Sequence, residues 1–221
     1  MDSDNARARN NMLTQQLRPW GVLDESVLEA LGSLPREFFV PDAYRGLAYA
    51  DIEIPIGEAR SMLAPKVVGR LLQALAVQPG ERALAVGAQT GYLAACLARL
   101  GARTIGVESD PALAAQARER IAALGLDTVE IRVADALAGL TPGGPFHVIA
   151  LTGSVPQMDR LGILEAQLVP GGRLFGVVGE APLMEAWRIT RISVTEFRRE
   201  SLFETCIPPL VEQPPAASFV F

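Results

Sequence analysis

A short turn flanked by glycines is the feature of this sequence best suited to binding chemistry. Gly87 and Gly91 enclose residues 88–90, directly after the apolar run at residues 83–86 and before a helical stretch. Glycine lets a backbone approach a ligand closely, and the N-terminus of the following helix offers free N–H groups. The pattern therefore predicts a ligand at this turn, while the competing interpretation is an ordinary tight turn.

A carboxylate follows at the spacing that a nucleoside site needs. Glu108 ends the next predicted strand, 21 residues after Gly87. In nucleotide-binding α/β folds an acid about 20 residues after the first glycine of the turn binds the ribose hydroxyls, and a carboxylate can accept from both. A dinucleotide would favour the spacing G-x-G-x-x-G in front of its pyrophosphate, which Gly87 and Gly91 do not form. We therefore favour a nucleoside without phosphates, such as S-adenosylmethionine, over an acid that merely ends a strand.

Aspartate, histidine and cysteine side chains are the other candidates for binding or catalysis. Asp135 follows the third predicted strand, where it could accept from an adenine amino group or cap a helix N-terminus. His147 is the single histidine and lies within a predicted strand, which indicates a structural role. One histidine with the distant Cys96 and Cys206 forms no metal-ligand set, so we predict no metal site and no Ser-His-Asp arrangement.

Alternating strands and helices must position these residues. The pattern predicts an α/β fold with a doubly wound, mostly parallel sheet and an antiparallel C-terminal edge. Strands are predicted at 82–87, 104–108, 129–133, 146–151, 172–178, 187–192 and 201–207, and helices at 67–76, 91–100 and from 111. We expect a single domain over 1–221, with an N-terminal helical and lid segment at 1–65, a cofactor-binding core at 66–178, and C-terminal strands and a tail at 179–221.

Composition narrows the class of protein. A net charge of −5 and no long Lys/Arg cluster argue against a nucleic-acid partner, and 49% hydrophobic residues suffice for a core. No run approaches the ~20 apolar residues of a membrane span. Two separated cysteines and a polar N-terminal stretch predict a cytoplasmic protein.

With these residues in view, the chain resembles the protein-L-isoaspartate O-methyltransferase family along nearly its whole length. The N-terminal array carries the likeness most specifically, because other methyltransferases lack it. It consists of Gln16-Leu17, Gly21-Val22, the run from Pro35 to Pro41, Ala48-Tyr49-Ala50-Asp51 and Ile54-Pro55-Ile56-Gly57, joined later by Pro145 to Ile149 and Gln167 to Leu174.

The resemblance implies a repair enzyme with a Rossmann-like, S-adenosylmethionine-dependent methyltransferase fold. It would transfer a methyl group from S-adenosylmethionine to the α-carboxylate of L-isoaspartyl residues in a damaged peptide or protein. The cofactor would lie against Gly87, Gly91, Glu108 and Asp135. We expect no nucleic-acid or membrane partner, and a monomer or small homo-oligomer.

Four positions depart from the family pattern. Ala85 and Gln89 stand where the first motif has an acid and a central glycine, and His147 stands for a usual aspartate. Leu63 occupies the place of the serine at the reaction site, which leaves Ser61 as the candidate polar contact there. Two alternatives follow: a catalytically impaired relative that acts as a binding or regulatory module, and a methyltransferase with a different acceptor.

Overall fold

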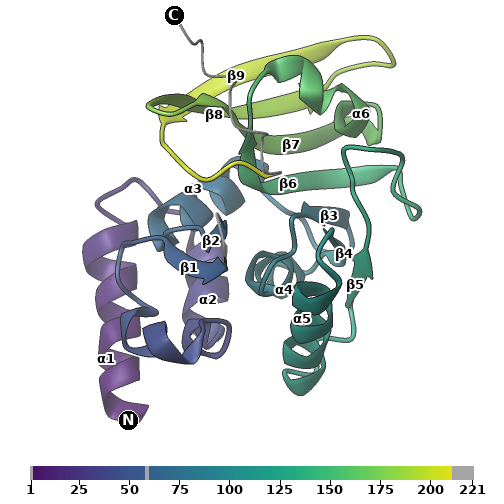
Figure 1. Ribbon diagram of the computed structural model, residues 1–221. Coiled ribbons are helices and arrows are strands. Elements are labelled where there is room, and N and C mark those ends of the chain that lie inside the picture. Colours follow the sequence, from purple (N-terminus) through teal and green to yellow (C-terminus); the bar gives the residue numbers. More distant parts are fainter. Residues whose placement is uncertain (1, 58–59, 211–221) are drawn as a thin grey trace, which may run out of the picture.

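A seven-stranded sheet forms the centre of the structure, a computed structural model that describes residues 2–57 and 60–210 (Figure 1). Its strands run in the order β5-β4-β3-β6-β7-β8-β9. Their bounds are β3 Arg82–Val86, β4 Arg103–Glu108, β5 Val129–Val133, β6 Phe146–Val155, β7 Leu168–Glu180, β8 Leu183–Arg191 and β9 Phe197–Glu204.

The sheet is parallel from β5 to β7 and antiparallel at β8 and β9. Chain order reverses beside β3, because β4 lies on one side of it and β6 on the other. In open parallel sheets, ligands bind beyond the carboxyl ends of the strands at such a reversal. The predicted fold class, including the antiparallel C-terminal edge, is confirmed.

Helices cover both faces of the sheet. Alternate residues of β3 point to opposite sides: Ala83 and Ala85 belong to one buried hydrophobic cluster, and Leu84 and Val86 to the other. The first cluster includes α3 (Pro65–Leu75), α4 (Tyr92–Arg99) and α5 (Pro111–Ala123), and the second includes the short α6 (Gly162–Glu165). Both faces are thus buried, as a parallel sheet requires.

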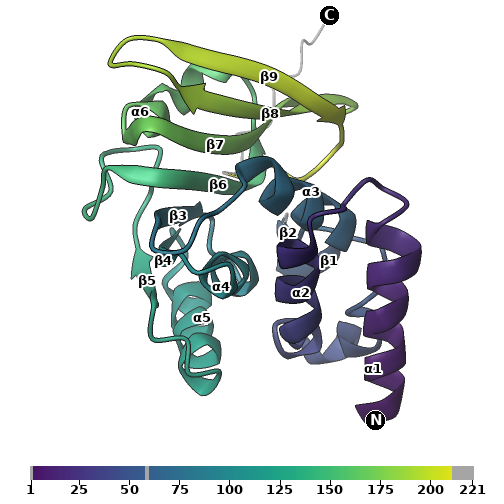
Figure 2. The same ribbon diagram turned by 180° about the vertical axis from the view of Figure 1, so that it is seen from behind.

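The N-terminal helices stand to one side of these layers. α1 (Asp2–Asn11) continues into a π-helical stretch at Met12–Leu17, and α2 (Glu25–Ser33) follows. The Asp24 side chain caps α2 by accepting from the N–H groups of Ser26 and Val27. The helices line up as α1, α2, α4 and α5 across the molecule, with α1 outermost (Figures 1 and 2).

The structure corrects the sequence-based boundaries in three places. A two-stranded hairpin, β1 (Ile54–Gly57) and β2 (Arg60–Met62), lies within the helical and lid segment predicted at 1–65, where we predicted no strand. β7 is longer than the predicted 172–178, because it pairs with β8 along its whole second half. The last strand is Phe197–Glu204 rather than 201–207, because residues 207–210 leave β8 and pair in parallel with Ser154 near the end of β6.

Within residues 2–57 and 60–210, no helix combines the length and the apolar character that a membrane span needs. The apolar C-terminal end that the sequence shows at Phe219-Val220-Phe221 lies outside the described residues.

Candidate functional site

The turn after β3 has an unusual backbone at three positions. Gly87, Gln89 and Gly91 all have positive φ, of 73°, 51° and 90°. A Cβ on Gly87 would lie 2.5 Å from Thr152 Oγ1 and 2.7 Å from a methyl group of Leu210. Glycine at 87 is therefore required by both conformation and space. At Gln89 a side chain is accommodated despite the left-handed conformation, which few residues adopt.

Glu108 holds this turn in place. It ends β4, and only 5% of its side chain is exposed. Its Oε2 accepts from the backbone N–H of Gln89 at 2.9 Å, and its Oε1 accepts from the N–H of Asp110 at 3.0 Å and from the Ser109 hydroxyl at 3.4 Å. A buried carboxylate needs such donors to offset its lost hydration. Glu108 thereby joins the turn after β3 to the turn after β4.

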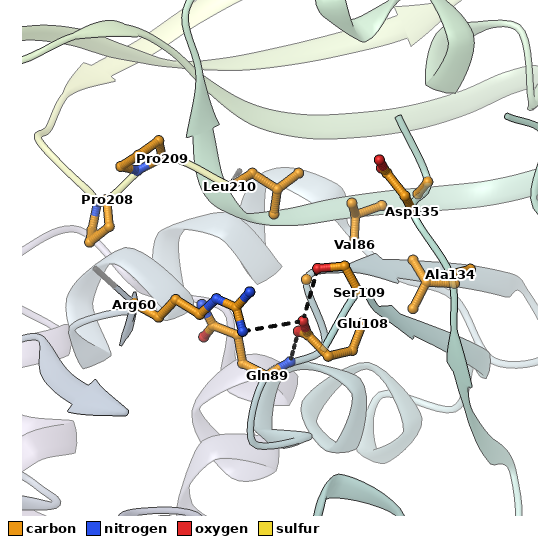
Figure 3. A pocket seen from close by; sticks show the side chains of 13 residues that line it. Arg60, Val86, Gln89, Glu108, Ser109, Ala134, Asp135, Pro208, Pro209 and Leu210 are labelled. Atoms are coloured by element: carbon orange, nitrogen blue, oxygen red, sulfur yellow. Dashed lines mark hydrogen bonds and ion pairs between the residues drawn. The ribbon is translucent and has the colours of Figure 1, made fainter. Parts of the chain in front are cut away.

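Arg60 reaches this carboxylate from the hairpin. Its Nη1 lies 3.1 Å from Asp110 Oδ2. It also lies 3.9 Å from Glu108 Oε1, and Figure 3 shows this second pair. Asp110 uses its other oxygen to cap α5 by accepting from the N–H groups of Ala112 and Leu113. Those backbone bonds, and then Arg60, hold the pKa of Asp110 below its usual range. The hairpin is thus tied by charge to the ends of β4 and α5.

These residues line one narrow pocket at the carboxyl ends of β3, β4 and β5. Its free volume is about 30 Å³, roughly the space of one water molecule. Asp135 stands at its rim, where its Oδ1 accepts from the N–H of Leu137 (Figure 3). The full lining is Arg60, Val86, Gly87, Gln89, Val107, Glu108, Ser109, Ala134, Asp135, Ala136, Pro208, Pro209 and Leu210.

A segment that we call the C-terminal strap, residues 207–210, closes the pocket from above. The N–H of Ser154 donates to Pro208 O at 3.0 Å, and the N–H of Leu210 donates to Ser154 O at 2.9 Å. Gly153 permits this contact, because a Cβ there would lie 2.5 Å from the Leu210 backbone. The strap is attached to β6 by these backbone bonds and places the Leu210 side chain beside Val86 (Figure 3).

The structure brings three of the five predicted site residues together. Gly87, Glu108 and Asp135 line the same pocket. Gly91 does not line it; it caps α4 and packs against Ala117 of α5. Ser61 lies on β2 opposite Pro55 and is also not among the lining residues. Their functional roles stay predictions.

The departures from the family pattern lie in well-packed surroundings. Ala85 is fully buried within β3, and Leu63 is 4% exposed. The Leu63 carbonyl accepts from Nη2 of the fully buried Arg36 at 2.7 Å, and the Arg36 Nε donates to Ala48 O. His147 Nδ1 accepts from the backbone N–H of Arg82, which fits the structural role predicted for it.

Sequence reasoning missed Arg60 and the strap. Both reach the pocket through contacts between residues far apart in the chain: Arg60 meets Asp110 across 50 positions. The one signal for the strap was the pair Pro208-Pro209, which breaks strand pairing after β9. Among the described residues there is no group of three or more His, Cys, Asp or Glu side chains suited to hold a metal ion.

Comparison with known proteins identifies relatives of the whole chain. Residues 8–213 match the family model described as Protein-L-isoaspartate(D-aspartate) O-methyltransferase. A Protein-L-isoaspartate O-methyltransferase of Methylorubrum extorquens is 40% identical over 94% of this chain and 90% of its own. One from Aeropyrum pernix is 39% identical over 95% of this chain and 82% of its own.

Solved structures share the fold at lower identity. A Plasmodium falciparum chain named as a beta-aspartate methyltransferase, crystallised with S-adenosyl-L-homocysteine, superposes with a TM-score of 0.77 at 22% identity, covering 91% of this chain and 97% of its own. A protein-L-isoaspartate O-methyltransferase structure gives 0.79 at 22% identity, covering 91% and 65%. At this identity the likeness supports the fold alone.

Proposed function

The chain belongs to the protein-L-isoaspartate O-methyltransferase family, and on that premise we propose that the pocket around Glu108 is where it holds S-adenosylmethionine. The enzyme methylates L-isoaspartyl residues of peptides and proteins with this cofactor. The observation that carries the site is Glu108 itself, a buried carboxylate at the end of β4 that faces the turn after β3.

The reaction requires little acid–base catalysis by the side chains of this protein. S-adenosylmethionine supplies, when bound, a methyl group that its positively charged sulfur already activates. The acceptor carboxylate is ionised at neutral pH, so no strong base is needed. The chain must bind both partners, align them and exclude water, and a pocket closed by the strap serves the last of these tasks.

The residues present fit this cofactor in chemistry. Glu108 can accept from ribose hydroxyls, and Asp135 at the end of β5 can accept from an adenine amino group. Val86, Ala134 and Leu210 offer apolar walls to a base between them. At Gly87 the space that a Cβ would need is taken by Thr152 and by Leu210 of the strap, so a ligand reaches this backbone only once Leu210 has moved. Since ligand pockets usually measure about 300–1,000 Å³, the strap must give way when the cofactor enters.

The acceptor end lies on the hairpin side of the pocket. We propose, on the family resemblance, that Ser61 of β2 makes a polar contact to the acceptor. It neighbours Arg60, but side chains alternate along a strand and Ser61 does not line the pocket, so the acceptor would meet it on the other face of the hairpin. Leu63 makes this end more apolar than a serine would. The Arg36 guanidinium, which donates to the carbonyl of Leu63, fixes the position of this segment.

Methyl transfer to a matched pair of peptides tests the function. The protein is incubated with methyl-labelled S-adenosylmethionine and a peptide that carries either L-isoaspartate or ordinary aspartate at one position. We expect label in the isoaspartyl peptide alone, released as methanol in base. No incorporation at high enzyme and cofactor concentration would contradict the proposal, and equal labelling of both peptides would indicate a different acceptor.

We further propose a cytoplasmic enzyme that is a monomer or small homo-oligomer, in which residues 1–65 act as the lid over the 66–178 core. The proposal of a reducing compartment rests on Cys96 and Cys206, which form no disulfide with each other. Sedimentation velocity measures the oligomeric state directly. The alternatives suggested by Ala85, Gln89 and Leu63 gain no support from the relatives.

A further inference from the structure

Arg60 is the one positively charged residue among the described residues that line the pocket. It projects from the hairpin between Gln89 and the strap residue Pro208 (Figure 3). About 30% of its side chain is exposed, so the guanidinium can change partners without crossing the core. Its present partners, Asp110 and Glu108, both have other donors.

Glu108 has more donors than it can keep when a ribose binds. Its two oxygens already accept from two backbone N–H groups and one hydroxyl, and Arg60 approaches Oε1 as well. A carboxylate offers about four acceptor sites, and the two hydroxyls of a ribose need two of them. Arg60, at 3.9 Å, and the Ser109 hydroxyl, at 3.4 Å, are the most weakly held of these partners. When both leave, the two backbone N–H groups keep their bonds and two acceptor sites remain for the ribose.

The turn after β3 offers few groups to the charged end of the cofactor. The N–H of Ala88 donates to Val107 O, that of Gln89 to Glu108, and that of Gly91 to Ala88 O. Ala85 is fully buried and supplies no acid for an ammonium group. A ligand that carries both an ammonium group and a carboxylate therefore finds one clear partner in this pocket. Its carboxylate can pair with the positive charge of Arg60.

We propose that Arg60 binds the carboxylate of the methionyl end of S-adenosylmethionine and in doing so leaves Glu108 free for the ribose. This rests on the proposed function. Arg60 then has two roles. Without ligand, it neutralises the negative charges of Glu108 and Asp110 by pairing with them. With ligand, it pairs with the ligand carboxylate instead, which favours a cofactor that carries the amino-acid group. Arginine suits this exchange because its planar fork donates to two oxygens of one carboxylate.

Two ligands that differ by the amino-acid group test the proposal. S-adenosylhomocysteine carries the methionyl carboxylate, and 5′-methylthioadenosine has the same nucleoside and sulfur without it. Their affinities are measured by isothermal titration calorimetry for the unaltered protein and for Arg60→Met. We expect Arg60→Met to weaken S-adenosylhomocysteine by about tenfold or more and to leave 5′-methylthioadenosine equal or tighter.

Two matched variants make the result specific. Arg60→Lys keeps the charge without the fork, so its affinity for S-adenosylhomocysteine is expected between those of Arg60→Met and the unaltered protein. Lys66→Met removes a cation that lies in α3 and pairs with Asp51 outside this pocket, and it should change neither affinity. Thermal unfolding of each variant reports whether the fold is intact.

Three other results would contradict either the role of Arg60 or the proposed function. Equal weakening of both ligands in folded Arg60→Met and Arg60→Lys would mean that Arg60 acts only through the fold, and equal tightening would mean that it only competes for Glu108; either overturns the proposal. If the unaltered protein binds neither ligand, the proposed function itself fails.

Discussion

At the scale of single residues, the site depends on Glu108 more than on any glycine. The carboxylate of Glu108 accepts from the turns after β3 and β4 and lines the pocket. One side chain thus both shapes the pocket and is proposed to bind the ligand. A change at this position should therefore affect both folding and binding, and each has to be measured separately.

We predict that Glu108→Gln weakens S-adenosylhomocysteine binding by about tenfold or more and lowers the free energy of unfolding by about 1–3 kcal/mol. Its amide nitrogen would face a backbone N–H of Gln89 or Asp110, donor against donor. Calorimetry measures the affinity, and urea unfolding measures the stability. Glu196→Gln, an exposed acid in the turn before β9, should alter neither quantity. Unchanged affinity in folded Glu108→Gln would remove Glu108 from the cofactor site.

At the scale of elements, the site is made by three connections that cross the carboxyl edge of the sheet. The turn after β3, the hairpin and the strap meet there, although about 120 residues separate the first turn from the strap. The strap is held to β6 mainly by two backbone hydrogen bonds, whereas the hairpin is anchored by Ile54 and Met62, which are buried in the same hydrophobic cluster as β3. The rigid sheet therefore fixes Glu108, while the strap is the covering connection that can open.

Two positions in the turn after β3 should differ in how strongly a substitution changes stability. Gly87→Ala is expected to lower the free energy of unfolding by about 2–3 kcal/mol, because the new Cβ would meet Thr152 and Leu210 in a left-handed backbone. Gln89→Gly relieves a left-handed non-glycine residue and should leave stability within about 1 kcal/mol. Its backbone N–H still donates to Glu108. Urea unfolding of both variants measures the contrast, and equal losses would contradict this picture.

At the scale of the whole molecule, the sequence predicted the sheet and the Glu108 side of the site but not what covers it. Gly87 and Glu108 could be found because consecutive parallel strands end at the same edge, so sequence spacing translates directly into proximity. Arg60 and Leu210 could not, because a short hairpin with Pro55 and Gly57 has little periodicity, and the strap reaches its place only through pairing with Ser154. Such long-range contacts depend on how packed elements meet rather than on local pattern.

Acid stability of the whole fold should depend on an ion pair at the opposite edge of the sheet. Arg173 of β7 donates to Glu81 before β3 and to the carbonyls of Leu75 and Ala76 at the end of α3, which joins three elements. Both charged side chains are about 15% exposed. Partial burial on its own would raise the pKa of Glu81. Hydrogen bonds from Arg173 and from the N–H of Gln78 outweigh this effect and lower the pKa of Glu81 below its ordinary value.

Because the pKa of Glu81 is lower in the folded than in the unfolded chain, its stabilisation is present above the unfolded value of about 4.3 and is lost as the pH falls through the folded value. Glu81→Gln should therefore cost about 2 kcal/mol at pH 7 and much less near pH 3. Chemical unfolding across this range measures the difference. Glu25→Gln, which breaks an exposed pair with Arg18, serves as the control and should cost under about 0.5 kcal/mol at either pH. A loss at Glu81→Gln that persists unchanged at pH 3 would show that the position stabilises the fold through packing rather than through its charge.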